Sequence, residues 1–114
     1  MTEASGLVLA LTTEANAERA EQLAQALLER RLVACVSIHA VQSHYRWEGG
    51  VQCSHEAQLL MKTSARHLDA LRSAVFELHS YDIPEWLSWP ATSSPAYRAW
   101  ALFELSSDVS PPAA

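Results

Sequence analysis

The stretch Tyr45-Arg46-Trp47-Glu48-Gly49-Gly50 lies between two long segments that both have the composition of β-strands. Its two glycines predict a tight turn, because glycine tolerates the positive φ that two-residue hairpin turns require. The residues before the glycines are bulky and polar-tipped, which is unusual for a turn that faces solvent. We therefore expect a hairpin arm whose tip contacts another subunit, a ligand or a loop of the same chain.

The segments on either side of this turn, Leu32–Trp47 and Val51–Thr63, predict a pair of antiparallel strands. Successive side chains of a strand point to opposite faces, so a turn at Glu48-Gly49 determines which residues lie opposite one another. The partners are then Trp47 with Gly50, Cys35 with Lys62, and His44 with Cys53.

This register separates the two cysteines, Cys35 and Cys53, by nine residues along the ladder, roughly 30 Å at the rise of a strand. A disulfide needs Cα atoms within about 7 Å, so we expect no intrachain bridge, as is usual in a reducing compartment. The N-terminus carries no positive region, and the apolar stretch Leu7–Leu11 is too short for a signal-peptide core or a membrane span. We therefore expect a cytoplasmic protein without a membrane partner.

The rest of the chain alternates between strand and helix patterns. Thr13 or Asn16 can cap the free N–H groups of a first helix, and Ser64 can cap a second. The predicted elements are a strand over Leu7–Thr13, a helix to about Arg31, the two hairpin strands, a helix to about His79, an extended segment over Trp86–Trp89 ended by Pro90, and a helix over about Ser94–Leu105. The apolar stripes of the first two helices are Ala20, Leu23, Ala24, Leu27 and Leu28, and then Leu68, Leu71, Val75 and Leu78.

This order, β-α-β-β-α-β with an added C-terminal helix, is the ferredoxin-like split βαβ arrangement, an α+β fold. We expect an antiparallel sheet with helices on one face. The 114 residues fit a single domain over 1–114, with a tail at 106–114 that we expect to be frayed. The bare face of the sheet and the long central hairpin both predict an oligomer in which the hairpin reaches across subunits.

Composition and motifs exclude several classes of function. A net charge of −5 argues against a nucleic-acid surface, and 49% hydrophobic residues indicate a globular protein. The chain has no phosphate-binding glycine loop and no C-x-x-C, H-E-x-x-H or G-x-S-x-G motif. Nothing in the sequence places Glu48, Glu56 or Glu85 against a nucleophile, so we expect no enzyme, no catalytic residue and no obligatory cofactor.

Six short motifs, in their order and spacing, resemble the CutA family of divalent-cation tolerance proteins. The resemblance covers most of the chain, from about Leu7 to Phe103. The motifs are Leu32-Val33-Ala34-Cys35, Tyr45-Arg46-Trp47-Glu48-Gly49, Leu60-Met61-Lys62-Thr63, His79-Ser80-Tyr81, Ile83-Pro84-Glu85 and Tyr97-Arg98-Ala99-Trp100.

The resemblance implies a homotrimer, similar in build to the PII signalling proteins, whose long strands cross between subunits. It also implies a link to tolerance of copper and other divalent metals. A ligand-binding cleft near a subunit boundary is implied for the residues Trp47, Lys62, Tyr81, Glu85 and Trp100.

The sequence departs from the family pattern at the copper ligands proposed for some members. Leu11 stands where those members carry a cysteine, and Leu78 stands where they carry the first of two histidines. His79 matches the second histidine and is the one ligand position that is retained.

The predicted register suggests a separate metal site. His44 and Cys53 are cross-strand neighbours, with His55 two residues along on the same face, and imidazole with thiolate suits Cu(I) or Zn(II). The simpler explanation is that they are ordinary polar residues of an exposed arm or of a subunit contact. His39 and His67 have no convergent partner, so a surface or core position is the default for them.

Lys62, the only lysine, ends a strand just before a helix start. An ammonium beside free helix N–H groups would make an anion-binding corner, whereas the simpler alternative is an ion pair with Glu85 or Glu48. Trp86 and Trp89 are expected in the core or an interface. Trp100 shares a helix face with Tyr97, and its role, in the core, in an interface or in a binding cleft, stays open.

The preferred function is a non-catalytic protein of divalent-cation tolerance that binds or responds to copper or similar ions. A second hypothesis is a PII-like trimeric sensor that binds a small anionic ligand in an intersubunit cleft around Lys62. A third is a structural trimer that acts through partner proteins, which the sequence does not identify.

Overall fold

The computed structural model describes residues 6–106, and the predicted order of elements is confirmed in them. Of the tail predicted to be frayed, residues 107–114 lie outside the described part. The elements are β1 (Leu7–Glu14), α1 (Ala17–Glu29), β2 (Cys35–Trp47), β3 (Gly50–Ser64), the short 3₁₀ helix η2 (Ala65–His67), α2 (Leu68–Leu78), β4 (Leu87–Ala91) and α3 (Pro95–Leu105).

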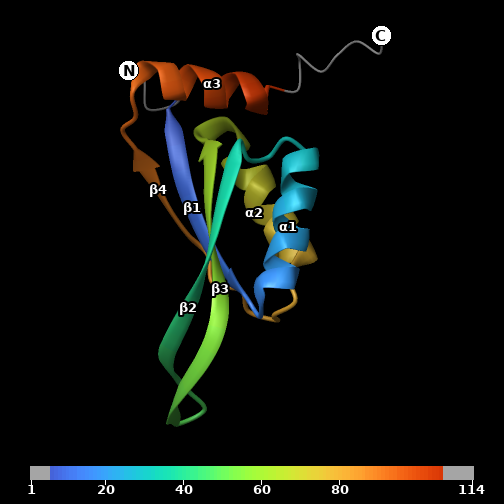
Figure 1. The fold of residues 1–114 in the computed structure, drawn as a ribbon, viewed down its shortest axis with the longest axis vertical. Coiled ribbons are helices and arrows are strands. Elements are labelled where there is room, and N and C mark those ends of the chain that lie inside the picture. The colour runs from blue at the N-terminus through green and yellow to red at the C-terminus, as the bar shows by residue number, and fades with distance from the viewer. Residues whose placement is uncertain (1–5, 107–114) are drawn as a thin grey trace.

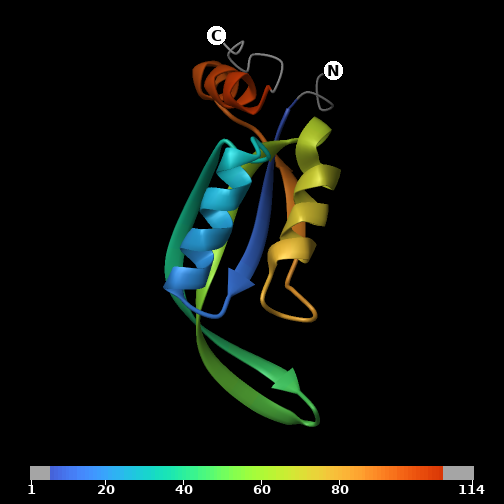
Figure 2. The same cartoon turned by 90° about the vertical axis from the view of Figure 1, so that its right-hand side faces the viewer.

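The four strands form one antiparallel sheet in the order β2-β3-β1-β4. Helices α1 and α2 cover one face of this sheet, and α3 lies across the end where β1 begins (Figures 1 and 2). The opposite face has no helix over it among the described residues. This is the α+β split βαβ arrangement that the sequence predicted.

The register of the hairpin is also confirmed: Cys35 lies opposite Lys62, and His44 lies opposite Cys53. The turn is Glu48-Gly49, with φ of 51° and 84°. Two successive left-handed residues are the signature of the type I′ hairpin turn, whose twist matches that of the flanking strands. Both cysteines are free thiols, as expected from their separation.

The hydrophobic core lies between the two helices and the sheet. Trp86 packs against it and meets the Phe76 ring edge-on, with centroids 6.4 Å apart, so the core role expected for Trp86 is confirmed. Among the fully or nearly fully buried core residues are Ala20, Leu23, Ala24 and Leu27 of α1, Leu71, Ala74 and Val75 of α2, and Ala10, Ala57, Leu59 and Met61 of the sheet.

Two of the residues predicted for the buried stripes of the helices, Leu28 and Leu78, are exposed, so these two predictions are wrong. Leu28 is 42% exposed because it follows Leu27 by about 100° around the helix axis, which turns it off the buried face. Leu78 is 37% exposed at the last residue of α2. Its place in the buried stripe is taken by Ala74, one turn earlier.

Some predicted element ends also differ. Of the two caps predicted for α1, Asn16 is confirmed, because its side chain accepts from the Arg19 N–H at 2.9 Å. The helix ends two residues before Arg31. The Ser64 hydroxyl bonds the His67 ring in place of a backbone N–H. Strand β4 continues through Pro90, which is tolerated because β4 is an edge strand.

The far half of the β2–β3 hairpin extends well beyond both helices as a bent arm (Figure 2). The described residues measure 51 × 34 × 21 Å. Apolar side chains on the arm are exposed, among them Trp47 at 52% and Val51 at 70%. Within the described residues, no helix is long and apolar enough to span a membrane.

Candidate functional site

An open cleft of about 930 Å³ lies between the arm and the segment that joins α2 to β4. Strand alternation places its β1 and β3 residues, Thr13, Glu56 and Gln58, on the sheet face that carries no helix. The lining residues are Thr13, Ser43, His44, Tyr45, Trp47, Glu56, Gln58, Tyr81, Asp82, Ile83 and Glu85.

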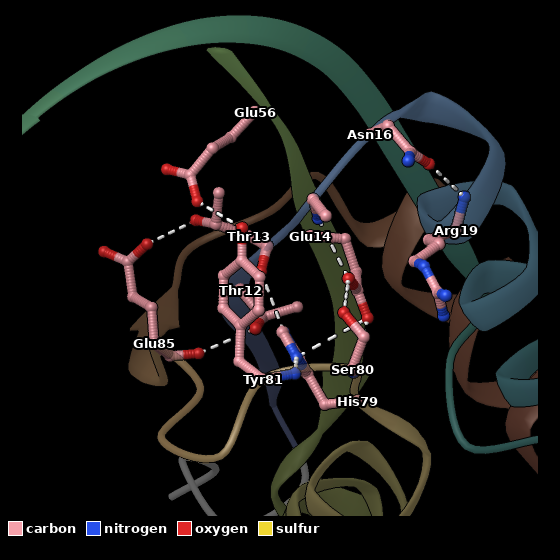
Figure 3. A network of polar contacts seen from close by, with 11 residues as sticks. Thr12, Thr13, Glu14, Asn16, Arg19, Glu56, His79, Ser80, Tyr81 and Glu85 are labelled. Carbon is pink, nitrogen blue, oxygen red and sulfur yellow. Dashed lines mark hydrogen bonds and ion pairs between the residues drawn. The ribbon is translucent and has the colours of Figure 1, made fainter. Parts of the chain in front are cut away.

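Two carboxylates of the cleft are held by hydroxyl groups (Figure 3). The Tyr81 hydroxyl donates to Glu56 Oε2 at 2.6 Å, and the Thr13 hydroxyl donates to the carboxylate of Glu85. The Thr12 hydroxyl donates to the backbone carbonyl of Glu85 at 2.7 Å. The α2–β4 segment is therefore fastened to β1 and β3 by side chains that also shape the cleft.

A buried network fixes the same segment from the helix side of β1. Ser80 donates to the Glu14 carboxylate twice, from its hydroxyl at 2.6 Å and from its backbone N–H at 3.0 Å. The Ala15 N–H adds a third hydrogen bond at 2.9 Å. The Glu14 side chain is 2% exposed, so the charged form depends on these three donors.

His79 completes this network as a neutral imidazole with both ring nitrogens engaged. Its Nδ1 accepts from the Tyr81 N–H at 3.0 Å, so its Nε2 carries the proton and donates to the Thr13 carbonyl at 2.8 Å. The Glu14 carboxylate lies 3.5 Å from Nδ1, and the His79 side chain is fully buried. The metal role predicted for His79 stays a prediction, and it would require these hydrogen bonds to break.

The environment shifts the acidity of two groups in this region. Burial alone would raise the pKa of Glu14, but the hydrogen bonds from Ser80 and Ala15 hold it below its ordinary value. Burial raises the pKa of Tyr81 strongly, and the hydrogen bond to the Glu56 carboxylate raises it further. Tyr81 is therefore a hydrogen-bond donor here and not a source of protons.

The predicted pair His44 and Cys53 is present on the arm. His44 Nε2 lies 3.8 Å from Cys53 Sγ, and both residues are exposed. Residues 6–106 contain no cluster of three or more His, Cys, Asp or Glu side chains arranged to hold a metal ion. One chain thus offers two adjacent donors at this position.

Lys62 lies away from the cleft, near the end of the sheet that carries α3. Its ammonium donates to the Ser37 hydroxyl at 2.7 Å and lies 3.8 Å from Cys35 Sγ, both on β2. It forms no ion pair with a carboxylate in the described part of the chain, so neither Glu85 nor Glu48 is its partner there. Lys62 is six residues from Glu56 along β3, roughly 20 Å.

Trp100 is at the same end of the molecule as Lys62. It stacks at a tilt on Tyr97, with ring centroids 5.5 Å apart, and lines a smaller hollow of about 380 Å³ beside Arg31 and Glu104. Trp89 is 40% exposed on the helix-free face.

Within one chain the structure therefore gathers Trp47, Tyr81 and Glu85 in the cleft, whereas Lys62 and Trp100 lie elsewhere. The intersubunit cleft that would unite all five stays a prediction.

Sequence reasoning missed the buried Glu14–Ser80 contact. The sequence does contain a signal for the Glu14 side of this contact. Every second residue of β1 lies on its buried face, and this series is Val8, Ala10, Thr12 and Glu14. An acidic residue at the end of such a series predicts a buried carboxylate. Its partner Ser80 is 66 residues away in sequence, and no local pattern identifies it.

Comparison with known proteins gives the family of the chain. The model of the CutA1 divalent ion tolerance proteins matches residues 8–103. The chain belongs to this family. The divalent-cation tolerance protein CutA of Pectobacterium atrosepticum is 37% identical over 95 residues, which cover 82% of this chain and 86% of that protein. The CutA of Thermus thermophilus is 39% identical over 92 residues, covering 79% and 89%.

Solved CutA structures have the same fold. The CutA of Synechococcus elongatus PCC7942 superposes with a TM-score of 0.87 at 44% identity and covers 91% of this chain and 94% of that one. CutA1 of Oryza sativa gives 0.84 at 32% identity, covering 90% and 96%. The chain spans about half of the length of the chloroplastic CutA of Arabidopsis thaliana, with 36% identity over 95 residues.

Proposed function

We propose that this chain acts in divalent-cation tolerance by binding or responding to a divalent cation, without catalytic turnover. Membership of the CutA1 family supports the general role. The observation that supports direct binding is the contact between His44 Nε2 and Cys53 Sγ, 3.8 Å apart on the exposed arm. Imidazole and thiolate together suit copper or zinc.

In a single chain the proposed metal site is open to solvent and should bind a metal ion weakly. A closed structural zinc site uses about four ligands, and the arm supplies two in contact, with His55 two residues from Cys53 on the same face of β3. A symmetric assembly that brought equivalent arms together would add further donors from the same residues. We therefore include the homotrimer in the proposal. A cytoplasmic location is a separate part of the same proposal.

The experiment is a titration of the reduced protein with Zn(II), followed by thermal unfolding. We expect Zn(II) to raise the unfolding midpoint of the wild type and to leave that of the His44→Ala/Cys53→Ser double variant unchanged. Co(II) in place of Zn(II) should give thiolate-to-cobalt charge-transfer absorption that Cys53→Ser removes. His39→Ala is the matched control, because His39 is also exposed on β2 but faces the other side of the sheet.

The metal hypothesis fails if no divalent ion shifts the midpoint, or if the shift survives in the double variant. Loss of the shift in the His39→Ala control would instead indicate that the effect depends on the arm in general.

The alternative of a PII-like sensor for an anionic ligand depends on Lys62. The described cleft contains no lysine or arginine, so this alternative requires Lys62 and Trp100 from a neighbouring subunit to complete the site. A phosphate-bearing metabolite that stabilised the wild type but not Lys62→Ala would favour it.

A further inference from the structure

We propose that Arg31 is a latch that holds α3 against the end of the sheet, and that α3 is released as a unit when this latch opens. The inference goes beyond the proposed function and does not rest on it, because the latch lies at the end of the molecule away from the arm (Figure 1). Both partners of the contact belong to one chain, so the latch is the same in a single chain and in a homotrimer.

The backbone of Arg31 has a conformation that favours glycine. Its φ is 57°, and it follows α1 at the position where many helices end with a left-handed residue. The N–H of Arg31 donates to the Leu28 carbonyl at 3.0 Å. The N–H of Leu32 donates to the Leu27 carbonyl at 3.1 Å, which completes a Schellman motif. A residue other than glycine loses a factor of about 5–30 in population there, so we expect a contact of the arginine side chain to compensate.

That contact lies at the last turn of α3. The Arg31 guanidinium donates from Nη1 to the backbone carbonyl of Glu104 at 2.8 Å, and the same nitrogen lies 3.9 Å from Glu104 Oε1. The last four carbonyls of a helix have no partner inside the helix, and a cation beside them is favourable. Arg31 therefore completes the C-terminal ends of two helices, α1 with its backbone and α3 with its side chain.

Helix α3 packs separately from the hydrophobic core. Its buried residues are Ala101 and Leu105, and within residues 6–106 neither belongs to the core cluster between α1, α2 and the sheet. An isolated helix shorter than about 12–15 residues is marginal in water, and α3 has 11 residues. The helical state of α3 therefore depends on its contacts with the rest of the chain, and these contacts can break while the core stays closed.

Helix α3 is held at both of its ends. Only residues 92–94 separate its first residue from β4, so the chain itself keeps the N-terminal end in place. Its C-terminal end lies near the end of α1 (Figures 1 and 2), and there Arg31 holds it. Opening of the latch therefore frees α3 from its C-terminal end. Because α3 carries Trp100, the latch also determines the position of one residue predicted for the intersubunit cleft.

The test is amide hydrogen exchange by NMR on the full chain in its native assembly, with protection factors compared between α3 and β3. We expect Arg31→Ala to lower the protection of the α3 amides by about tenfold or more, because a hydrogen bond from a charged group is worth about that factor. The protection of the Leu59 and Met61 amides of β3 should stay as in the wild type, because these residues belong to the core cluster.

Arg31→Gly separates the role of the backbone from that of the side chain. It removes the contact with Glu104 but also the strain at a φ of 57°, so α3 should lose as much protection as in Arg31→Ala, whereas the Leu32 amide should gain protection. Arg30→Ala is the matched control, since the exposed Arg30 guanidinium pairs with Glu77 of α2. Glu104→Gln keeps the backbone carbonyl and should lower α3 protection by less than about fivefold.

Unchanged α3 protection in both Arg31→Ala and Arg31→Gly would overturn the proposal, because other contacts, such as those between subunits, would then hold α3. An equal fall in the protection of β3 and α3 would also overturn it, since α3 would open only together with the whole domain. The same loss of α3 protection in Arg30→Ala would attribute the effect to positive charge at this end of α1 in general, and it would exclude a specific latch.

Discussion

At the scale of single residues, the contacts of Glu14 depend on the charge of its buried carboxylate. This carboxylate is 2% exposed at the end of the inner strand β1, and it accepts three hydrogen bonds. Two of these come from Ser80, so one side chain joins β1 to the segment that forms the cleft wall. Removing the charge of Glu14 should therefore weaken both the end of β1 and the segment between α2 and β4.

We expect Glu14→Gln to lower the free energy of unfolding by about 2–3 kcal/mol at neutral pH. The amide oxygen can take the place of Oε1, which accepts from the Ala15 N–H and the Ser80 hydroxyl, but its NH₂ then faces the Ser80 N–H that donates to Oε2. Hydrogen bonds to a charged group are worth about 1.5–3 kcal/mol each. Urea titration measures the change. Glu21→Gln, an exposed carboxylate of α1, should cost less than about 0.5 kcal/mol.

The loss of unfolding free energy caused by Glu14→Gln should become smaller as the pH falls. The pKa of Glu14 in the folded chain lies below its ordinary value of 4.5, so its charge stabilises the fold above that value. This contribution is lost as the pH falls through the lower folded pKa, and the gap between wild type and Glu14→Gln should then narrow. A gap that stayed constant into acid would show that the contact does not depend on charge.

At the scale of elements, the turn of the arm carries backbone strain at Glu48, whose φ is 51° without the freedom of glycine. Asparagine tolerates this region better and precedes glycine in favoured type I′ turns. We expect Glu48→Asn to stabilise the chain by about 0.5 kcal/mol. Gly49→Ala should destabilise it by about 1–2 kcal/mol, although a Cβ there would meet no atom within 4 Å.

Gly50→Ala is the matched control for these turn variants. Gly50 does not have a positive φ, and an added Cβ would lie 4.0 Å from its nearest neighbours. Urea unfolding and hydrogen exchange of the arm amides compare the three. If Gly50→Ala cost as much as Gly49→Ala, the strain argument would be wrong.

The register of the arm could be predicted from sequence because it depends on local signals. A Gly-containing turn and strict alternation along β2 and β3 determine which residues face one another, including His44 and Cys53. The stripe of α1 was overextended to Leu28 for a related reason. Periodicity predicts the direction of a side chain, but the width of the buried face depends on how closely the sheet approaches.

The cleft could be predicted only in part. Trp47, Tyr81 and Glu85 were assigned to it through a family resemblance, whereas Glu56, Asp82 and Thr13 were not. Their proximity depends on how the α2–β4 segment wraps the end of β1, through contacts such as Thr13 with Glu85, 72 residues apart. Pairings of this kind follow from topology and leave no periodic trace in the sequence.

At the scale of the whole molecule, the helix-free face of the sheet requires cover. Leu87 and Trp89 of β4 are 52% and 40% exposed, and Trp47 is exposed on the arm. Large apolar side chains exposed on one face of a sheet are typical of an interaction site. The sequence resemblance predicts that this cover comes from two further copies of the chain.

Light scattering tests that assembly. We expect a mass three times that of the 12.6 kDa chain, and we expect Trp89→Glu to reduce it by placing a charge on the apolar face. Arg66→Glu, an exposed change in η2, should leave the mass unchanged. A monomeric wild type would contradict the assembly, and a dimer would keep the interface argument but exclude three-fold symmetry.

The strand order β2-β3-β1-β4 also has a consequence for biosynthesis. β1 emerges from the ribosome before the other three strands, yet it is an inner strand. Its second edge pairs with β4, which ends only at Ala91. During translation that edge stays without its native partner while the hairpin can already close, because hairpin contacts are local. The nascent chain therefore completes its sheet late, and the cleft wall between α2 and β4 is among the last parts to form.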